Sequence, residues 1–172
     1  MDEPSVTEES MVVPSSRKDL GVHTFSLTNI REAESRIHEI AVVNRTKAPE
    51  LLACFNVAFL NLSNYTATLK AEQILAKRRL REVSAMVILD RAPQILLDRG
   101  LPQSKDLREA VMMKDLEYLS ALDQTNMIEA TLEFLEGKKE AITMAYTAVK
   151  RLLPDASTSM TSMARVLNGK SS

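Results

Sequence analysis

Apolar residues recur along the second half of the chain at alternating spacings of three and four. From Leu107 to Leu153 this pattern averages 3.5 residues, the period that keeps one helix face against a partner helix over many turns. It predicts a long helix over residues 105–153 with an apolar face, here called the inner seam. The apolar members are Leu107, Val111, Tyr118, Ala121, Ile128, Leu132, Leu135, Ile142, Tyr146, Val149 and Leu153, and Lys114, Thr125 and Lys139 fill the remaining positions.

The partner of this helix is predicted upstream, because residues 51–87 show nearly the same spacing. Pro49 suits the first turn of that helix, where its missing N–H has no helical partner. Pro93 predicts a kink or break, and Gly100 predicts the end of the helix near residue 98. The helix over residues 49–98 and the C-terminal helix are therefore expected to form a long antiparallel, coiled-coil-like hairpin.

The segments outside the hairpin are shorter or more polar. Residues 1–24 form an acidic and polar arm that cannot offset its chain entropy alone, and residues 154–172 form a Ser/Thr-rich tail. A short amphipathic helix is predicted over residues 29–45, after a cluster of capping residues. The fold class expected is all-α, with a helical domain over residues 25–153, flexible tails, and association into an oligomer that covers the long hairpin.

Composition narrows the functional classes. The chain has 172 residues, enough for one domain, and a formal net charge of −1, so it has no global attraction for nucleic acid or acidic membranes. The lone Cys54 cannot form an internal disulfide, which fits a reducing compartment. No secretory signal or membrane span is recognisable. The expected location is the cytoplasm, of a cell or an infected host, or a virion, with no membrane partner.

Catalytic chemistry finds little support. The two histidines, His23 and His38, have no cysteine or carboxylate at a metal-ligand spacing, and the four glycines build no phosphate-binding loop. The carboxylates Glu129, Glu133 and Glu136 lack the Glu-x-x-His partner of a metal bundle. We therefore expect no catalytic residue, no metal, no cofactor and no enzymatic activity.

A dense group of cations is the most suggestive charged element. On a helix these side chains project from a short length and suit phosphate binding. Residues 70–109 carry a net charge of +3, whereas residues 114–140 carry −4. The group, here called the basic cluster, consists of Lys70, Lys77, Arg78, Arg79 and Arg81.

Two interpretations of the basic cluster stay open. Several copies around an oligomer would bind nucleic acid together, through backbone contacts with little sequence preference, because the aromatic residues fit the core better than a stacking surface. Alternatively, antiparallel packing sets the basic helix beside the acidic one, and the cations pair with carboxylates such as Glu133 or Glu136.

A family resemblance adds to the first interpretation. The stretch Ala76-Lys77-Arg78-Arg79-Leu80 resembles the Leu-Lys-x-Arg-Leu stretch of the UvsY-type recombination mediators of tailed phages. The segments that follow are also similar: a glycine turn at Arg99-Gly100, then Tyr118-Leu119-Ser120-Ala121, then Ala145-Tyr146-Thr147-Ala148-Val149-Lys150.

The resemblance covers roughly residues 50–153. It implies a ring-like homo-oligomer that binds single-stranded DNA and loads a recombinase in place of a single-strand-binding protein. By position, Lys77 and Arg79 would contact DNA, although Arg78 stands where the family tends to have a small residue. The leading hypothesis is thus a non-enzymatic single-stranded DNA-binding mediator. The alternative is a helical assembly protein, such as a phage virion or scaffold component, whose hairpin mediates subunit packing.

Overall fold

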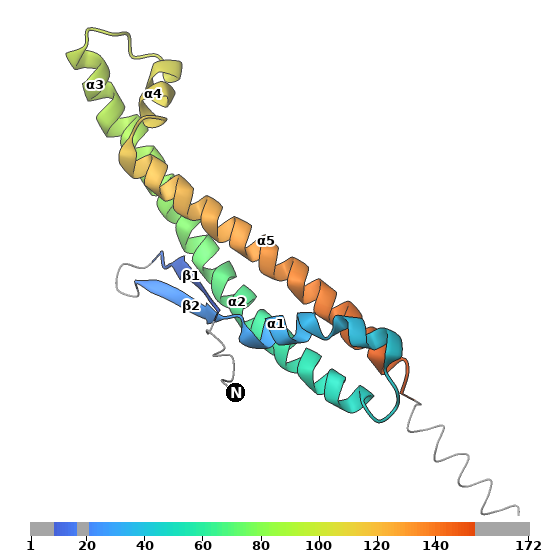
Figure 1. The fold of residues 1–172 in the computed structure, drawn as a ribbon. Helices are drawn as coiled ribbons and strands as arrows, with labels where there is room; N and C mark the ends of the chain where they lie inside the picture. The colour runs from blue at the N-terminus through green and yellow to red at the C-terminus, as the bar shows by residue number, and fades with distance from the viewer. Residues whose placement is uncertain (1–8, 17–20, 154–172) are drawn as a thin grey trace, which may run out of the picture. The chain divides into compact units, whose positions relative to one another are not determined.

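The computed structural model describes residues 9–16 and 21–153. They form a mostly helical chain with two short strands near its N-terminal end (Figure 1). The described residues divide into two compact units. The first combines those up to Leu27 with Ser63–Gly137, and the second combines Thr28–Leu62 with those from Lys138 on. The long helices α2 (Ala48–Met86) and α5 (Leu116–Lys150) contribute residues to both units.

The second unit contains α1 (Thr28–Ser35), the 3-10 turn η1 (Ile37–Val42), and segments of α2 and α5. An ion pair between Lys138 and Glu34 joins α5 to α1. The apolar side chains of this unit are buried on facing sides of its helices. They include Ile30, Ala33, Leu51, Phe55, Ala58, Leu62, Ile142, Ala145 and Val149.

The first helix is shorter than the sequence predicts. Residues 29–45 were expected to form one helix, but α1 ends at Ser35 and the chain continues as η1. The Asn44 side chain then accepts hydrogen bonds from the N–H groups of Thr46 and Lys47, at 3.1 and 3.0 Å. Asparagine side chains favour such caps over helix interiors, so the preceding helix ends before Asn44.

In the first unit, α2 continues through a π-helical turn, η2 (Val87–Arg91), into α3 (Ala92–Asp98). The N–H of Ala92 donates to the carbonyl of Val87, five residues back, where an α-helix would bond four back. Pro93 has no N–H and its ring crowds the preceding turn, and the wider turn accommodates it. The predicted kink therefore takes the form of a π turn within a continuing helix.

Gly100 ends α3. Its φ of 66° lies in the left-handed region, which glycine adopts without a side-chain clash. The Leu101 N–H donates to the Leu96 carbonyl at 2.9 Å, and the Gly100 N–H to the Leu97 carbonyl at 3.0 Å. These two bonds form a Schellman motif, which satisfies carbonyls at the helix end.

The single helix predicted over residues 105–153 is interrupted. It consists of α4 (Lys105–Met112), which Ser104 caps, and α5, which begins at Leu116. The Asp115 side chain accepts from the N–H groups of Glu117 and Tyr118, both at 3.0 Å. This is the geometry of a helix N-cap, and it starts a new helix where the apolar spacing alone predicts continuity.

The prediction for residues 1–24 implied an irregular N-terminal arm, but part of this arm forms regular structure. Strands β1 (Ser10–Pro14) and β2 (Val22–Ser26) pair antiparallel, with Val12 opposite Thr24. The fold is therefore mostly helical, in agreement with the expected all-α class, and it adds a small two-stranded sheet that was not predicted. The tail over residues 154–172 lies outside the described residues.

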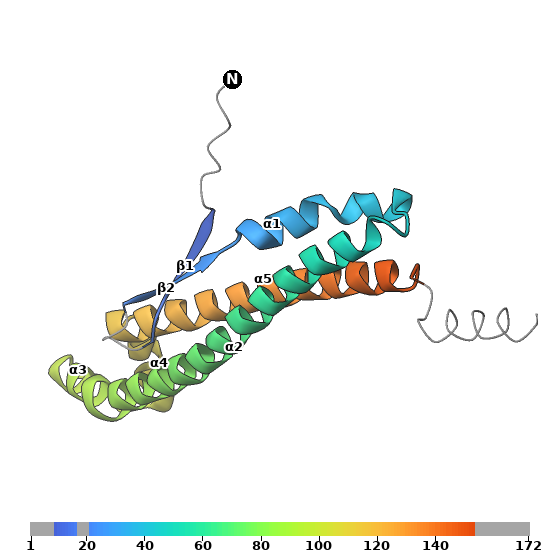
Figure 2. The ribbon, with the colours of Figure 1, turned by 90° about the horizontal axis from the view of Figure 1, so that it is seen from below.

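Contacts with α2 explain why the arm folds. The hairpin lies beside this helix in Figure 1, and Figure 2 shows the same hairpin from below. Val13 and Phe25 are buried, with exposed fractions of 1% and 6%. The Phe25 ring lies 4.8 Å from that of Tyr65 on α2, whose hydroxyl donates to the Ser26 carbonyl at 3.0 Å. The strands thus bury apolar area that the arm alone cannot bury.

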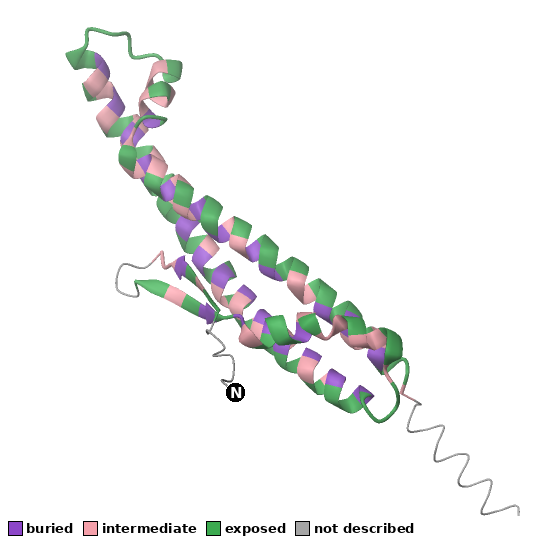
Figure 3. Cartoon of the chain, in the orientation of Figure 1, coloured by how far each residue is buried: buried purple, intermediate pink, exposed green. Residues whose placement is uncertain are grey.

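Burial follows the predicted spacing along α5 (Figure 3). Lys114 and the α4 residues Leu107 and Val111 depart from it, because the helix break changes the face they present: Lys114 is exposed, and the other two are half-buried. In the first unit, Val83 and Val87 pack with Met112 and Tyr118. The buried seam positions on α5 are Tyr118, Ala121, Thr125, Ile128, Leu132, Leu135, Ile142 and Val149, while the seam residues Lys139 and Tyr146 are half-buried; Ala145, outside the seam, is also buried.

Replacement of the α5 cap tests the helix break. We expect Asp115→Ala to lower the free energy of unfolding by about 1 kcal/mol, because the two N–H groups lose their acceptor. Asp115→Asn keeps a capping oxygen and should cost less. Thermal unfolding followed by circular dichroism measures both. Equal losses would show that the cap does not determine where α5 begins.

Candidate functional site

All five members of the basic cluster lie on α2 in the first unit, and all five are exposed. Lys70 and Lys77 contact α5. The Nζ atom of Lys70 lies 2.7 Å from a carboxylate oxygen of Glu136, and Nζ of Lys77 lies 2.7 Å from one of Glu129. The hydrogen bond from Lys77 holds the pKa of Glu129 below its ordinary value. These cations therefore join two antiparallel helix segments.

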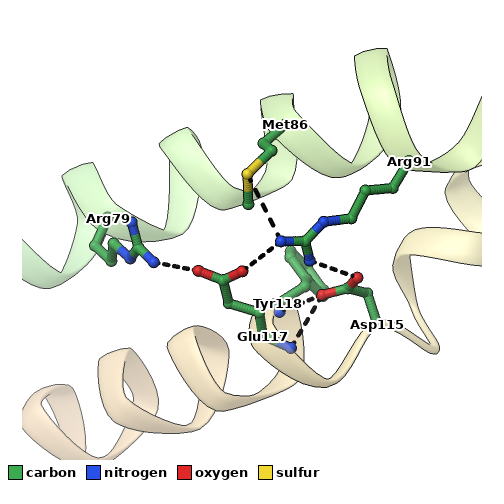
Figure 4. A network of polar contacts seen from close by, with 6 residues as sticks. All are labelled: Arg79, Met86, Arg91, Asp115, Glu117 and Tyr118. Carbon is green, nitrogen blue, oxygen red and sulfur yellow. Dashed lines mark hydrogen bonds and ion pairs between the residues drawn. The ribbon is translucent and has the colours of Figure 1, made fainter.

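Arg79 belongs to a network that links α2, η2 and the start of α5 (Figure 4). It pairs with Glu117, which also accepts from Arg91 at 2.7 Å. Arg91 reaches Asp115 as well, at 3.0 Å. Hydrogen bonds to Glu117 and Asp115 raise the pKa of Arg91, and the Tyr118 N–H, followed by Arg91, lowers the pKa of Asp115. Arg91 and Asp115 therefore remain charged around neutral pH.

The two remaining cations differ. Arg78 pairs with Glu82 on the next turn of the same helix, at 2.8 Å. Arg81 makes no ion pair with any residue in the ranges 9–16 and 21–153. The structure thus places four of the five predicted cations beside carboxylates. Of Glu133 and Glu136, the carboxylates that the sequence suggests as examples of partners, Glu136 pairs with Lys70.

Sequence reasoning missed a buried carboxylate, Glu72, which is 4% exposed. Its oxygens accept from the Ser15 hydroxyl at 3.0 Å and the Ser16 N–H at 2.6 Å, and His23 Nε2 lies 2.8 Å away. Burial raises the pKa of Glu72, but the bonds from His23, Ser16 and Ser15 outweigh it, and the pKa lies below its ordinary value. This Glu72 cluster holds the hairpin on α2. No local signal announces it, since its members are about 50 residues apart.

A second feature missed from the sequence is an exposed apolar line on α5. Met127 and Phe134 are 48% and 46% exposed, and Ala130 and Gly137 are exposed between them. We call these four residues the outer stripe. Each of them follows a residue of the inner seam by two positions, so they repeat the alternating spacing of three and four. This second line of uncharged residues could have been recognised in the sequence. The same spacing recurs in the second unit at Ala141 and Met144.

The other candidate residues form no further site. His23 lies in the Glu72 cluster and His38 is exposed on η1. In the described part of the chain, no three of the His, Cys, Asp and Glu side chains are grouped so that they could hold a metal ion. Its helices include none with the length and apolarity needed to cross a bilayer. No protein-family model, curated protein or solved structure matches the chain.

Acid should weaken the Glu72 cluster. Because the folded state lowers the pKa of Glu72, its stabilisation is complete above the ordinary value of 4.5 and is lost as the pH falls through the folded value. We expect Glu72→Gln to lower the free energy of unfolding by about 2 kcal/mol at neutral pH, because the bonds to a charged acceptor are lost. The difference from the wild type should shrink in acid.

Urea unfolding at several pH values measures this difference. Glu133→Gln is the control, since Glu133 is an exposed carboxylate of α5 with no polar partner among the described residues. A pH-independent difference between Glu72→Gln and the wild type would contradict the assignment.

Proposed function

We propose that the protein is a non-enzymatic helical assembly protein, whose copies associate through the outer stripe of α5. The observation that carries this proposal is the stripe itself: four uncharged residues at coiled-coil spacing, exposed on a helix whose opposite face is already buried. Exposed apolar side chains scattered singly need no explanation. A line of them at the period of helix packing fits a further helix.

A second copy of the chain is the partner we favour, because the outer stripe is self-complementary. Large and small side chains alternate along it, from Met127 through Ala130 and Phe134 to Gly137. In an antiparallel pair of helices, each large residue packs beside a small residue of the other copy. Such a contact uses the same surface twice and closes with two-fold symmetry.

A charge within the outer stripe should prevent this association. We expect Ala130→Glu to raise the dissociation constant at least about tenfold, because an unpaired carboxylate is costly to bury. Sedimentation equilibrium of the wild type and the variant measures it. Ala85→Glu makes the same change at an exposed position of α2, so it is the matched control and should associate normally. A wild type that stays monomeric at high concentration, or equal loss in both variants, would refute the proposal.

The second candidate function is that of the single-stranded DNA-binding mediator. Two observations favour it. The ion pairs of the basic cluster are exposed, and exposed pairs are weak and screened by salt, so phosphates can compete for the cations. Arg81 needs no such exchange, since it has no ion pair within the described ranges. Recombinase loading remains part of this candidate through the family resemblance alone.

Fluorescence anisotropy of labelled oligo-dT across a salt series tests DNA binding. We expect Lys77→Ala/Arg79→Ala to weaken binding and to reduce the slope of log affinity against log salt, because each lost phosphate contact releases one counterion fewer. Arg45→Ala removes an exposed cation of the second unit and serves as the control. Absence of binding at low salt would eliminate this candidate and leave the assembly protein.

A further inference from the structure

A groove of about 550 Å³ opens in the first unit, between α3 and the turn that joins α4 to α5. Three apolar side chains line it: Ile95 and Val111 are half-buried, and Leu116 is 83% exposed. Three cations also line it, namely Arg91, Arg99 and Lys114. The groove therefore combines apolar contact area with positive charge. It shares no residue with the outer stripe, and an inference from it stands without the proposed assembly function.

The cations of the groove are not equivalent. Arg91 is engaged by Asp115 and Glu117, the two carboxylates that line the groove, and Glu117 is paired with Arg79 as well. Within the described ranges, the side chains of Arg99 and Lys114 have neither an ion pair nor a hydrogen bond. The anions of the groove are thus satisfied, while two of its cations remain available to a ligand.

We propose that this groove binds an acidic peptide segment of a partner protein. An apolar side chain of the segment contacts Ile95, Val111 and Leu116, and carboxylates on either side of it pair with Arg99 and Lys114. Charge complementarity and apolar contact supply different parts of the recognition. A nucleic acid fits less well, because the groove contains no aromatic ring for a base to stack on and its apolar area would face a phosphate backbone.

The test uses the full chain and a fluorescein-labelled peptide, Glu-Glu-Leu-Glu-Leu-Glu-Glu, at low salt. We expect Arg99→Gln/Lys114→Gln to weaken binding about tenfold, since it removes two exposed charge pairs. Leu116→Ser should weaken binding about threefold through lost apolar contact. Arg45→Gln removes an exposed cation of the second unit, outside both the groove and the basic cluster, and should change nothing. All substituted residues are exposed, and circular dichroism checks that the variants fold.

Three results would overturn the proposal. The first is absence of peptide binding to the wild type at low salt. The second is equal binding by Arg99→Gln/Lys114→Gln and the wild type. The third is unchanged binding by Leu116→Ser together with displacement of the peptide by pyrophosphate or oligo-dT, which would define a simple anion or nucleic-acid site. Loss of affinity when leucine in the peptide is replaced by serine would support the proposal further.

Discussion

Burial of one face of α2 against one face of α5 is the constraint on which the first unit depends. Leu69 and Val83 on α2 and Ile128 and Leu135 on α5 are fully buried. Each such side chain contributes about 2 kcal/mol when it leaves water. A shift of one residue would turn either helix face by about 100° and expose this area. The exposed ion pairs contribute much less, so they follow from the register and do not set it.

The antiparallel register also decides the charge pattern. It places Lys70 beside Glu136 and Lys77 beside Glu129, so the basic stretch of one helix meets the acidic stretch of the other. A count of charges along the sequence identifies the basic and the acidic stretch, but it does not show that the two lie side by side. Such a count therefore could not distinguish a phosphate-binding surface from a surface whose cations are paired with carboxylates. The exposed surface that results is mixed in sign, with Arg81 as an unpaired exception in the described part of the chain.

The features that could be predicted from the sequence are local ones. The spacing of apolar residues marks the buried positions of α5 from Tyr118 onward, and Gly100 marks the end of α3. The break before α5 is harder to predict from the sequence, because Arg91, 24 residues away, helps to hold the Asp115 side chain. The β-hairpin is hard to predict for the same reason, since its strands depend on contacts with Tyr65 and Glu72. Both differences from the prediction, the helix break and the β-hairpin, depend on contacts between residues far apart in the sequence, and the spacing of apolar residues carries no information on such contacts.

The helix break at Asp115 connects the fold to the proposed surfaces. An uninterrupted helix would continue the inner seam through Lys114 and present no corner beside α3. Capping by Asp115 turns the chain there and leaves Leu116 and Lys114 exposed next to Arg99. Under the two proposals, salt should weaken peptide binding in the groove, because screening weakens charge pairing, whereas apolar association through the outer stripe should persist. A salt series would therefore distinguish the proposed peptide binding from the proposed self-association.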